Sequence, residues 1–401
     1  MILKSQLEQI VNKQFEWINS TAKGVLREQV ESVHATSGFA SIITGIRRCG
    51  KSTLMKQVMG RYKKGDTLYL NFDDIHLSSF EKHDFVRLYS LVEDSKAKVL
   101  FFDELQLVNG WEVFVHQLLR EGYLVYITGS NASMLSVELG THLTGRHLST
   151  ELFPFSYAEY LSFGKRRRGK DSFMSYLTEG GMPEYLTTHD SRVPLAMVDD
   201  ILVRDIAIRH GIRNVEPLKR LALYLLTNVA KPFSGNRLTS VVGDISASTV
   251  LDYVDYMRDS YLIDTASQYA TNIRATVRNP KKVYAIDTGI VSSVSLSQTD
   301  DIGHLLENYQ FIQLRKRAKG HVYYYRGKGE CDFVVTGTDN SPKELYQVCQ
   351  QLTADNMRRE IDGLREAMRD LHLQEGTIVT LSDEDILNVE EGVIRVVKAY
   401  A

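Results

Sequence analysis

The first third of the chain alternates short apolar segments with amphipathic ones. Four apolar segments predict β-strands, at residues 39–44, 67–72, 99–102 and 123–128. The third of them is apolar on both faces, as a buried parallel strand is. Residues 51–61 and 111–121 repeat apolar positions at helical spacing. Strands separated by helices predict βαβ units, so we expect a three-layer α/β domain with a parallel sheet over residues 1–155.

The pattern changes after residue 155. Residues 156–215 are more charged and helical, and we expect a helical linker or lid there. Their basic run at 165–170 is typical of a solvated surface loop, with a contact to a phosphate backbone as the alternative. Three helices are predicted within residues 216–290, at 217–229, at 236–242 and after a Ser246 cap. A strand–loop–strand at 269–283 follows them, an order typical of a winged helix-turn-helix.

Residues 291–401 form a third pattern, in which strands outnumber helices. Helices are predicted near 302–315 and 356–371. Five strands are predicted around them, at 322–326, 332–336, 345–349, 377–381 and 393–397. We therefore expect a separate small α/β domain at this end of the chain.

Composition narrows the class of protein. The 401 residues include 48 Lys+Arg and 50 Asp+Glu, with 43% hydrophobic residues, which excludes a disordered or fibrous chain. A net charge of −2 argues against a protein that coats nucleic acid. No apolar stretch approaches the roughly 18–20 residues that span a bilayer. Three cysteines do not make a disulfide framework, so we expect a cytoplasmic protein with no membrane partner.

A phosphate-binding motif lies between the first strand and the first helix. Residues 45–52, Gly-Ile-Arg-Arg-Cys-Gly-Lys-Ser, fit G-x-x-x-x-G-K-[ST] completely. Its backbone N–H groups would face the phosphates of ATP, Lys51 would contact the β- and γ-phosphates, and the Ser52 hydroxyl would bind Mg²⁺. The predicted nucleotide contacts are Gly45, Ile46, Arg47, Arg48, Cys49, Gly50, Lys51, Ser52 and Thr53. The sequence thus predicts a P-loop NTPase core.

Two acids follow the apolar strand at 99–102. Asp103 would hold Mg²⁺ through water, and Glu104 would orient and polarise the attacking water. The alternative is a strand-end acid that caps the next turn. Tandem acids favour ATP hydrolysis over nucleotide storage, because storage needs the Mg²⁺ ligand but not the base.

Further polar residues complete the predicted site. Ser130 and Asn131 follow the strand at 123–128 and would contact the γ-phosphate or the water, although an ordinary turn fits nearly as well. Arg146 would stabilise charge on the γ-phosphate, in cis or from a neighbouring molecule, with a structural salt bridge as the alternative. Cys49 lies at a helix N-terminus among cations, a setting that lowers a thiol pKa. One hypothesis is ready alkylation that Mg·ATP blocks, although the alternative, that Cys49 merely fills a variable loop position, is favoured.

These motifs carry a family resemblance over essentially the whole chain. It rests on residues 45–52, 70–74, 101–106, 128–131, 144–146, 152–161, 180–184 and 282–289. The chain resembles prokaryotic AAA-superfamily ATPases that join a P-loop core to a winged helix and a C-terminal restriction-endonuclease-like domain. The resemblance implies ATP binding and hydrolysis.

The resemblance also implies which C-terminal residues to compare with a nuclease centre. Active domains of this type use an acid on the first helix, an Asp on a strand, and Glu-x-Lys on the next strand. Glu307 and Asp332 match, but Gln347 and Cys349 stand at the Glu and Lys positions. An amide binds a hard cation weakly and a thiol supplies no charge, so we expect an inactive nuclease fold.

The predicted winged helix has mixed charge. Its recognition helix carries Asp252, Asp255 and Asp259 against Arg258, which would repel DNA phosphates. The predicted wing is more basic, with Arg274, Arg278, Lys281 and Lys282. DNA contact and a packing or hinge role both stay open, and the acids favour the second.

These observations favour an ATP-driven switch in which Mg·ATP controls the appended domains. The alternative is an ATP-regulated DNA-binding regulator or defence component. An ATP-dependent nuclease is disfavoured by Gln347 and Cys349. A protein partner and self-association are both compatible with the switch.

Overall fold

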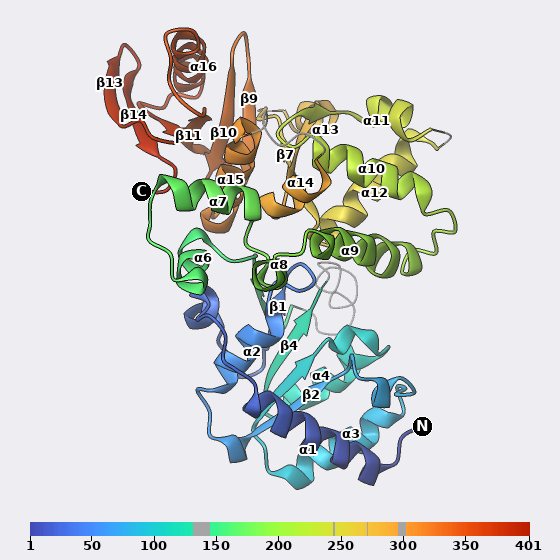
Figure 1. Cartoon of the computed structure of the whole chain (residues 1–401). Helices are drawn as coiled ribbons and strands as arrows, with labels where there is room; N and C mark the ends of the chain where they lie inside the picture. Colours follow the sequence, from blue (N-terminus) through green and yellow to red (C-terminus); the bar gives the residue numbers. More distant parts are fainter. Residues whose placement is uncertain (131–144, 244, 271, 296–301) are drawn as a thin grey trace. The chain divides into compact units, whose positions relative to one another are not determined.

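The computed structural model describes residues 1–130, 145–243, 245–270, 272–295 and 302–401 (Figure 1). They form two compact units. The first comprises residues 1–163 with 259–261, and the second comprises residues 164–258 with 262–401. Within the described residues, no helix combines the length and apolar character needed to cross a membrane.

The first unit is built on a five-stranded parallel sheet of order β2-β3-β4-β1-β5. Its strands are β1 (Ala40–Thr44), β2 (Thr67–Asn71), β3 (Val99–Asp103), β4 (Leu124–Gly129) and β5 (His147–Glu151). The first four confirm the predicted strands to within one or two residues, and β4 lies between β1 and β3. The edge strand β5 has no counterpart in the sequence prediction, because its His-Leu-Ser-Thr-Glu segment lacks an apolar pattern.

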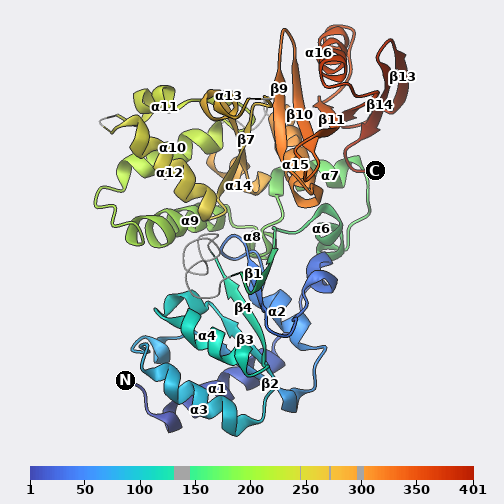
Figure 2. The same cartoon turned by 180° about the vertical axis from the view of Figure 1, so that it is seen from behind.

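Helices cover both faces of this sheet, which makes the unit three-layered (Figures 1 and 2). Its helices are α1 (Lys4–Ser20), α2 (Lys51–Met59), α3 (Asp84–Ser95), α4 (Trp111–Arg120) and α6 (Tyr157–Gly164). Alternate residues of β3 face opposite sides. Leu100 and Phe102 pack with α3 and α4, whereas Phe101 contacts the ring of Tyr62, which follows α2.

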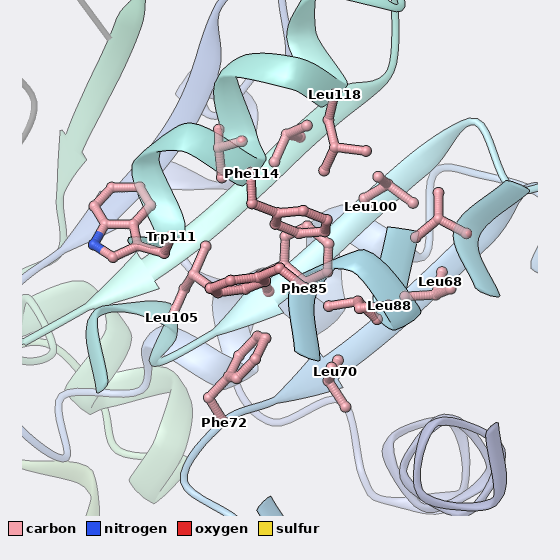
Figure 3. Packing of buried hydrophobic residues seen from close by; sticks show 14 of the residues in the cluster. Leu68, Leu70, Phe72, Phe85, Leu88, Leu100, Leu105, Trp111, Phe114 and Leu118 are labelled. Atoms are coloured by element: carbon pink, nitrogen blue, oxygen red, sulfur yellow. The ribbon is translucent and has the colours of Figure 1, made fainter. Parts of the chain in front are cut away.

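The core between β2, β3, α3 and α4 is rich in aromatic side chains (Figure 3). Phe85 of α3 and Phe114 of α4 stack with their ring centroids 4.7 Å apart. Phe102 of β3 lies against Phe114, with centroids 5.6 Å apart. Each buried phenylalanine contributes about 1.5–3 kcal/mol to stability, so this packing fixes β3 and the acids at its end.

The second unit begins with helices. These are α7 (Lys170–Glu179), α8 (Pro183–Thr188), α9 (Arg192–Asp200), a π-helical segment (Ile201–Ile208), α10 (Glu216–Thr227), α11 (Gly235–Val242) and α12 (Ala247–Asp259). The predicted cap before α12 is confirmed, because the Thr249 N–H donates to the Ser246 hydroxyl at 3.1 Å.

An antiparallel sheet of order β6-β8-β7 takes its first strand from between α10 and α11 and its other two strands from after α12. Its strands are β6 (Pro232–Phe233), β7 (Ile263–Ser267) and β8 (Lys281–Ala285). The predicted strand–loop–strand at 269–283 is wrong in its first half. β7 begins earlier, and helix α13 (Ile273–Arg278) occupies the connection, so Arg274 and Arg278 lie on a helix and not in a wing loop.

The C-terminal part carries a six-stranded mixed sheet of order β13-β14-β12-β11-β10-β9 (Figure 2). Its strands are β9 (Val322–Arg326), β10 (Glu330–Thr336), β11 (Pro342–Val348), β12 (Glu375–Thr380), β13 (Asp385–Val389) and β14 (Gly392–Lys398). Helices α15 (Ile302–Arg317) and α16 (Met357–Asp370) both pack against β10 and β11, and α14 (Thr288–Val294) precedes them. The predicted elements are present, and β13 is an additional strand paired with β14.

Candidate functional site

The P-loop leaves the carboxyl end of β1 and enters α2. Gly45 has a φ of 138° and Gly50 has a φ of 100°, a region that favours glycine. A Cβ on Gly45 would lie 2.1 Å from the Leu152 carbonyl oxygen. The glycines of the motif are therefore required by the backbone path and by close packing against the next segment of chain.

Lys51 is almost fully buried at the first turn of α2. Its ammonium donates to the carbonyls of Gly45 and Ile46, both at 3.1 Å, and lies 3.9 Å from Glu104 Oε1. Ser52, the next residue, is exposed. The Lys51 ammonium is thus held between the backbone of the P-loop and the Glu104 carboxylate.

Asp103 is fully buried at the end of β3, and both of its carboxylate oxygens accept hydrogen bonds. The Tyr69 hydroxyl donates to Oδ2 at 3.0 Å, and the Thr128 hydroxyl donates to Oδ1. Thr128 also accepts from the Glu104 N–H at 3.0 Å. Sequence reasoning missed Tyr69 and Thr128, although a hydroxyl at the end of β4 was a usable signal because β4 neighbours β3 in the sheet.

Glu104 adopts a left-handed backbone conformation, with a φ of 52°. The Gln106 side-chain amide donates to its Oε2. Burial raises the pKa of the Glu104 carboxyl, and the Lys51 ammonium partly opposes that shift. A carboxylate with a raised pKa accepts a proton more readily, which suits the predicted base.

The residues predicted to bind Mg²⁺ fit that ion. The Ser52 hydroxyl and the Asp103 carboxylate are hard oxygen donors, and Mg²⁺ keeps several waters when it binds few protein ligands. The described parts of the chain contain no group of three or more His, Cys, Asp or Glu residues suited to a metal.

The other residues predicted to contact the nucleotide differ in how far they are buried. Ser130 is buried directly after β4, while Asn131 lies outside the described residues. Arg47 is half-buried, and its charge lowers the pKa of Glu104. Arg48 is exposed and has a φ of 64°. Thr53 is half-buried in the first turn of α2.

The lowered pKa predicted for the Cys49 thiol is wrong. The side chain is fully buried, with Sγ 3.5 Å from the Leu152 carbonyl oxygen. Burial raises the pKa of Cys49, and the nearby Lys51 and Arg27 charges only partly offset this. The helix terminus and the cations are present as expected, but the lost contact with water outweighs them.

The cis alternative for Arg146 is also wrong. The Ala40 N–H donates to the Arg146 carbonyl at 3.0 Å, so this residue lies beside the amino end of β1. The P-loop follows Thr44 at the other end of that strand. Five residues of strand span roughly 16 Å, more than an arginine side chain can bridge. Arg146 is exposed, which leaves contact with a neighbouring molecule and a structural salt bridge as the alternatives.

Arg27 is a buried contact of the P-loop that sequence reasoning missed. It donates to the Cys49 carbonyl at 2.7 Å, to the Phe153 carbonyl at 2.6 Å and to Glu159 Oε1 at 2.9 Å. Its guanidinium also lies 4.9 Å from the Phe155 ring centroid. The P-loop is therefore joined to the segments before β1 and after β5. No local motif marks Arg27, because its partners lie 22 to 132 residues away.

The second unit brings the predicted nuclease positions together. Glu307 of α15 and Asp332 of β10 share the ammonium of Lys282, at 3.0 and 3.2 Å. Burial and the neighbouring Asp332 raise the pKa of Glu307. Lys282 is buried, so its predicted place in an exposed basic wing is wrong.

Gln347 and Cys349 differ in their surroundings. The Gln347 amide donates to Glu360 Oε2 at 2.6 Å and accepts from the Asp332 N–H at 3.3 Å. Cys349 belongs to the apolar core of the C-terminal sheet, and burial raises its pKa to about 12. Neither side chain supplies the charge that the corresponding nuclease position requires.

Two family models match parts of the chain, one in each unit. A family model described as "AAA domain" matches residues 38–161, and one described as "Domain of unknown function (DUF8612)" matches residues 170–301. Among solved structures, AMPPCP-bound DnaA from Aquifex aeolicus is 14% identical, covers 62% of this chain and 88% of its own, and has a TM-score of 0.28. The match to the AAA domain includes the P-loop, Asp103 at the end of β3 and Glu104 after it, which supports a nucleotide-binding P-loop domain in the first unit.

Two similar proteins span most of the chain. An uncharacterized protein of Haemophilus influenzae is 29% identical over 322 residues, which are 75% of this chain and 80% of that protein. The uncharacterized protein MJ1544 of Methanocaldococcus jannaschii is 32% identical over 371 residues, which are 86% of this chain and 82% of that protein. With this identity over nearly the full length of both proteins, and with an AAA domain at residues 38–161, the chain belongs to the MJ1544 family.

Proposed function

We propose that the first unit binds Mg·ATP and hydrolyses it, and that the nucleotide state switches the second unit. The convergence of Lys51 and Glu104 carries this proposal. Their charged groups lie 3.9 Å apart, one on the phosphate-binding loop and one beside the buried Asp103. This arrangement combines a cation for the phosphates with a base for water.

Each residue of the site would have a separate role in ATP hydrolysis. P-loop N–H groups and Lys51 bind the phosphate oxygens, and Ser52 and Asp103 would hold Mg²⁺, which supplies positive charge to the same oxygens. Glu104 accepts a proton from water as the water oxygen forms a bond to the γ-phosphorus. The bond between that phosphorus and the β,γ-bridging oxygen breaks, and ADP and phosphate result. Tyr69 and Thr128 hold Asp103 in place.

The experiment that tests this proposal compares ATP binding and turnover in the wild type, Lys51→Ala and Glu104→Gln. We expect Lys51→Ala to lose binding of a fluorescent ATP analogue, because the phosphates lose their cation. Glu104→Gln should bind ATP but turn it over at least roughly a hundredfold more slowly, the lower end of what a general base contributes. Lys63→Ala, an exposed lysine after α2, is the control. Wild-type turnover by Glu104→Gln would exclude Glu104 as the base.

The switch is favoured over the DNA-binding alternative by the charge of α12. Arg258 pairs with Asp255 at 3.2 Å and with Asp264 at 3.3 Å, so its charge is neutralised within its own unit. The burial of Lys282 removes another predicted phosphate contact. Gel shifts at several salt concentrations, with and without ATP, separate the two functions, since DNA binding through phosphates weakens steeply with salt.

A further inference from the structure

Lys282 projects from β8 into a group of acids that belong to the C-terminal sheet and helix α15. Its ammonium lies 2.7 Å from Glu330 Oε1, 3.0 Å from Glu307 Oε1 and 3.2 Å from Asp332 Oδ1. The lysine side chain is only 4% exposed. Three carboxylates from two elements thus converge on a single buried cation.

Further hydrogen bonds hold the carboxylates around the Lys282 ammonium in place. The Tyr284 hydroxyl donates to Glu307 Oε1 at 2.9 Å, and the Val348 N–H donates to Asp332 Oδ2 at 2.9 Å. Lys282 Nζ also lies 5.6 Å from the Tyr324 ring centroid. An ammonium has three N–H donors, which equals the number of carboxylate oxygens within 3.2 Å.

By the resemblance to restriction-endonuclease-like domains, two of these carboxylates, Glu307 and Asp332, correspond to positions that would hold a divalent cation. A divalent cation needs the same oxygens and would be repelled by the ammonium. Separating a buried charge from its partners is strongly destabilising, so a metal ion would not readily displace the lysine ammonium. The residues present therefore do not fit the metal that such a nuclease domain uses.

We infer that the Lys282 ammonium takes the place of a divalent cation in this carboxylate cluster and keeps metal out of it. The ammonium offsets the repulsion among the three carboxylates that meet around it. It also ties β8 to α15 and β10, so the cluster fastens the three-stranded sheet to the C-terminal sheet. The inference does not depend on ATP hydrolysis by the first unit.

The test measures thermal unfolding without nucleotide, in EDTA and in Mn²⁺. We expect wild type to have the same Tm in both. Lys282→Met should lower the Tm in EDTA by roughly 5–10 °C, because three acids lose their partner, and Mn²⁺ should restore most of that loss. Adding Asp332→Asn to Lys282→Met should abolish the effect of Mn²⁺. Lys281→Met, the neighbouring lysine, is the matched control and should behave as wild type does.

A second measurement covers the case in which Lys282→Met does not fold. Asp332→Asn alone should lower the Tm in EDTA, while the number of Mn²⁺ ions bound, counted by electron paramagnetic resonance, stays at the wild-type value. Loss of a bound Mn²⁺ in Asp332→Asn would show that wild type holds metal here and would overturn the inference. A folded Lys282→Met that gains no stability from Mn²⁺ would overturn it as well.

Discussion

Individual side chains in the nucleotide site are held by partners on neighbouring strands. Asp103 of β3 receives hydrogen bonds from Tyr69 of β2 and Thr128 of β4. Asp103 and Thr128 lie near the carboxyl ends of adjacent parallel strands, and the Tyr69 hydroxyl reaches Asp103 from the middle of the neighbouring strand β2, so the sheet itself brings them together. A buried carboxylate held on both sides stays oriented, which is what a Mg²⁺ ligand requires.

The Cys49 thiol should react slowly in the native protein. Its thiol is buried and its pKa is raised, so the native protein should resist N-ethylmaleimide at pH 7.5 far more than the urea-unfolded protein does. Mg·ATP should leave the slow native rate unchanged. Peptide mass spectrometry distinguishes Cys49 from Cys331 and Cys349, which are also buried. Rapid native labelling that Mg·ATP suppresses would restore the reactive-thiol hypothesis.

At the scale of elements, the P-loop depends on segments far from it in the chain. Arg27 precedes β1, Glu159 lies in α6, and the pair is buried against the Cys49 and Phe153 carbonyls. The Cys49 carbonyl points toward Arg27, so the N–H of Gly50 in the same peptide group points away from it. The guanidinium thereby helps to fix the direction of one phosphate-binding N–H.

Arg27→Met should therefore be strongly destabilising. Leaving Glu159 buried without its partner costs about 3–5 kcal/mol, which urea unfolding would measure. Arg61→Met is the matched control, because Arg61 also donates to two carbonyls but pairs with an exposed Glu31. The Arg61→Met substitution should lower the free energy of unfolding by only about 1 kcal/mol. Equal losses in the two variants would contradict the role assigned to burial.

At the scale of the whole molecule, the position of Arg146 bears on the hypothesis that a second chain contributes to the ATP site. It lies at the opposite end of β1 from the P-loop, and it is exposed. An arginine that completes an ATP site from this position must serve the site of another copy, as arginine fingers supplied in trans do.

A mixing experiment tests that role. Arg146→Ala and Lys51→Ala should each be inactive alone, but a mixture should regain turnover, because an intact P-loop meets an intact arginine at mixed contacts. The specific activity of wild type should also rise with protein concentration. Wild-type turnover by Arg146→Ala alone would show that Arg146 has no part in hydrolysis. An inactive mixture would contradict action in trans.

Local patterns in the sequence determined the P-loop, the tandem acids after β3 and most strands, because each depends on residues close together in the chain. Apolar runs identify buried strands, and the glycine spacing of residues 45–52 is set by the backbone path. The edge strands β5 and β13 escaped prediction, since β5 is polar and β13 is a short, largely exposed strand without the alternation of a half-buried one.

Only the tertiary structure decided what surrounds the charged and nucleophilic side chains. The Cys49 environment is set by Leu152, more than a hundred residues away, and the Lys282 environment by acids 25 to 50 residues away. The same fold separates Arg146 from the P-loop by the length of a strand. Burial and long-range partners change the charge and reach of a side chain, and neither is encoded in its immediate neighbours along the chain.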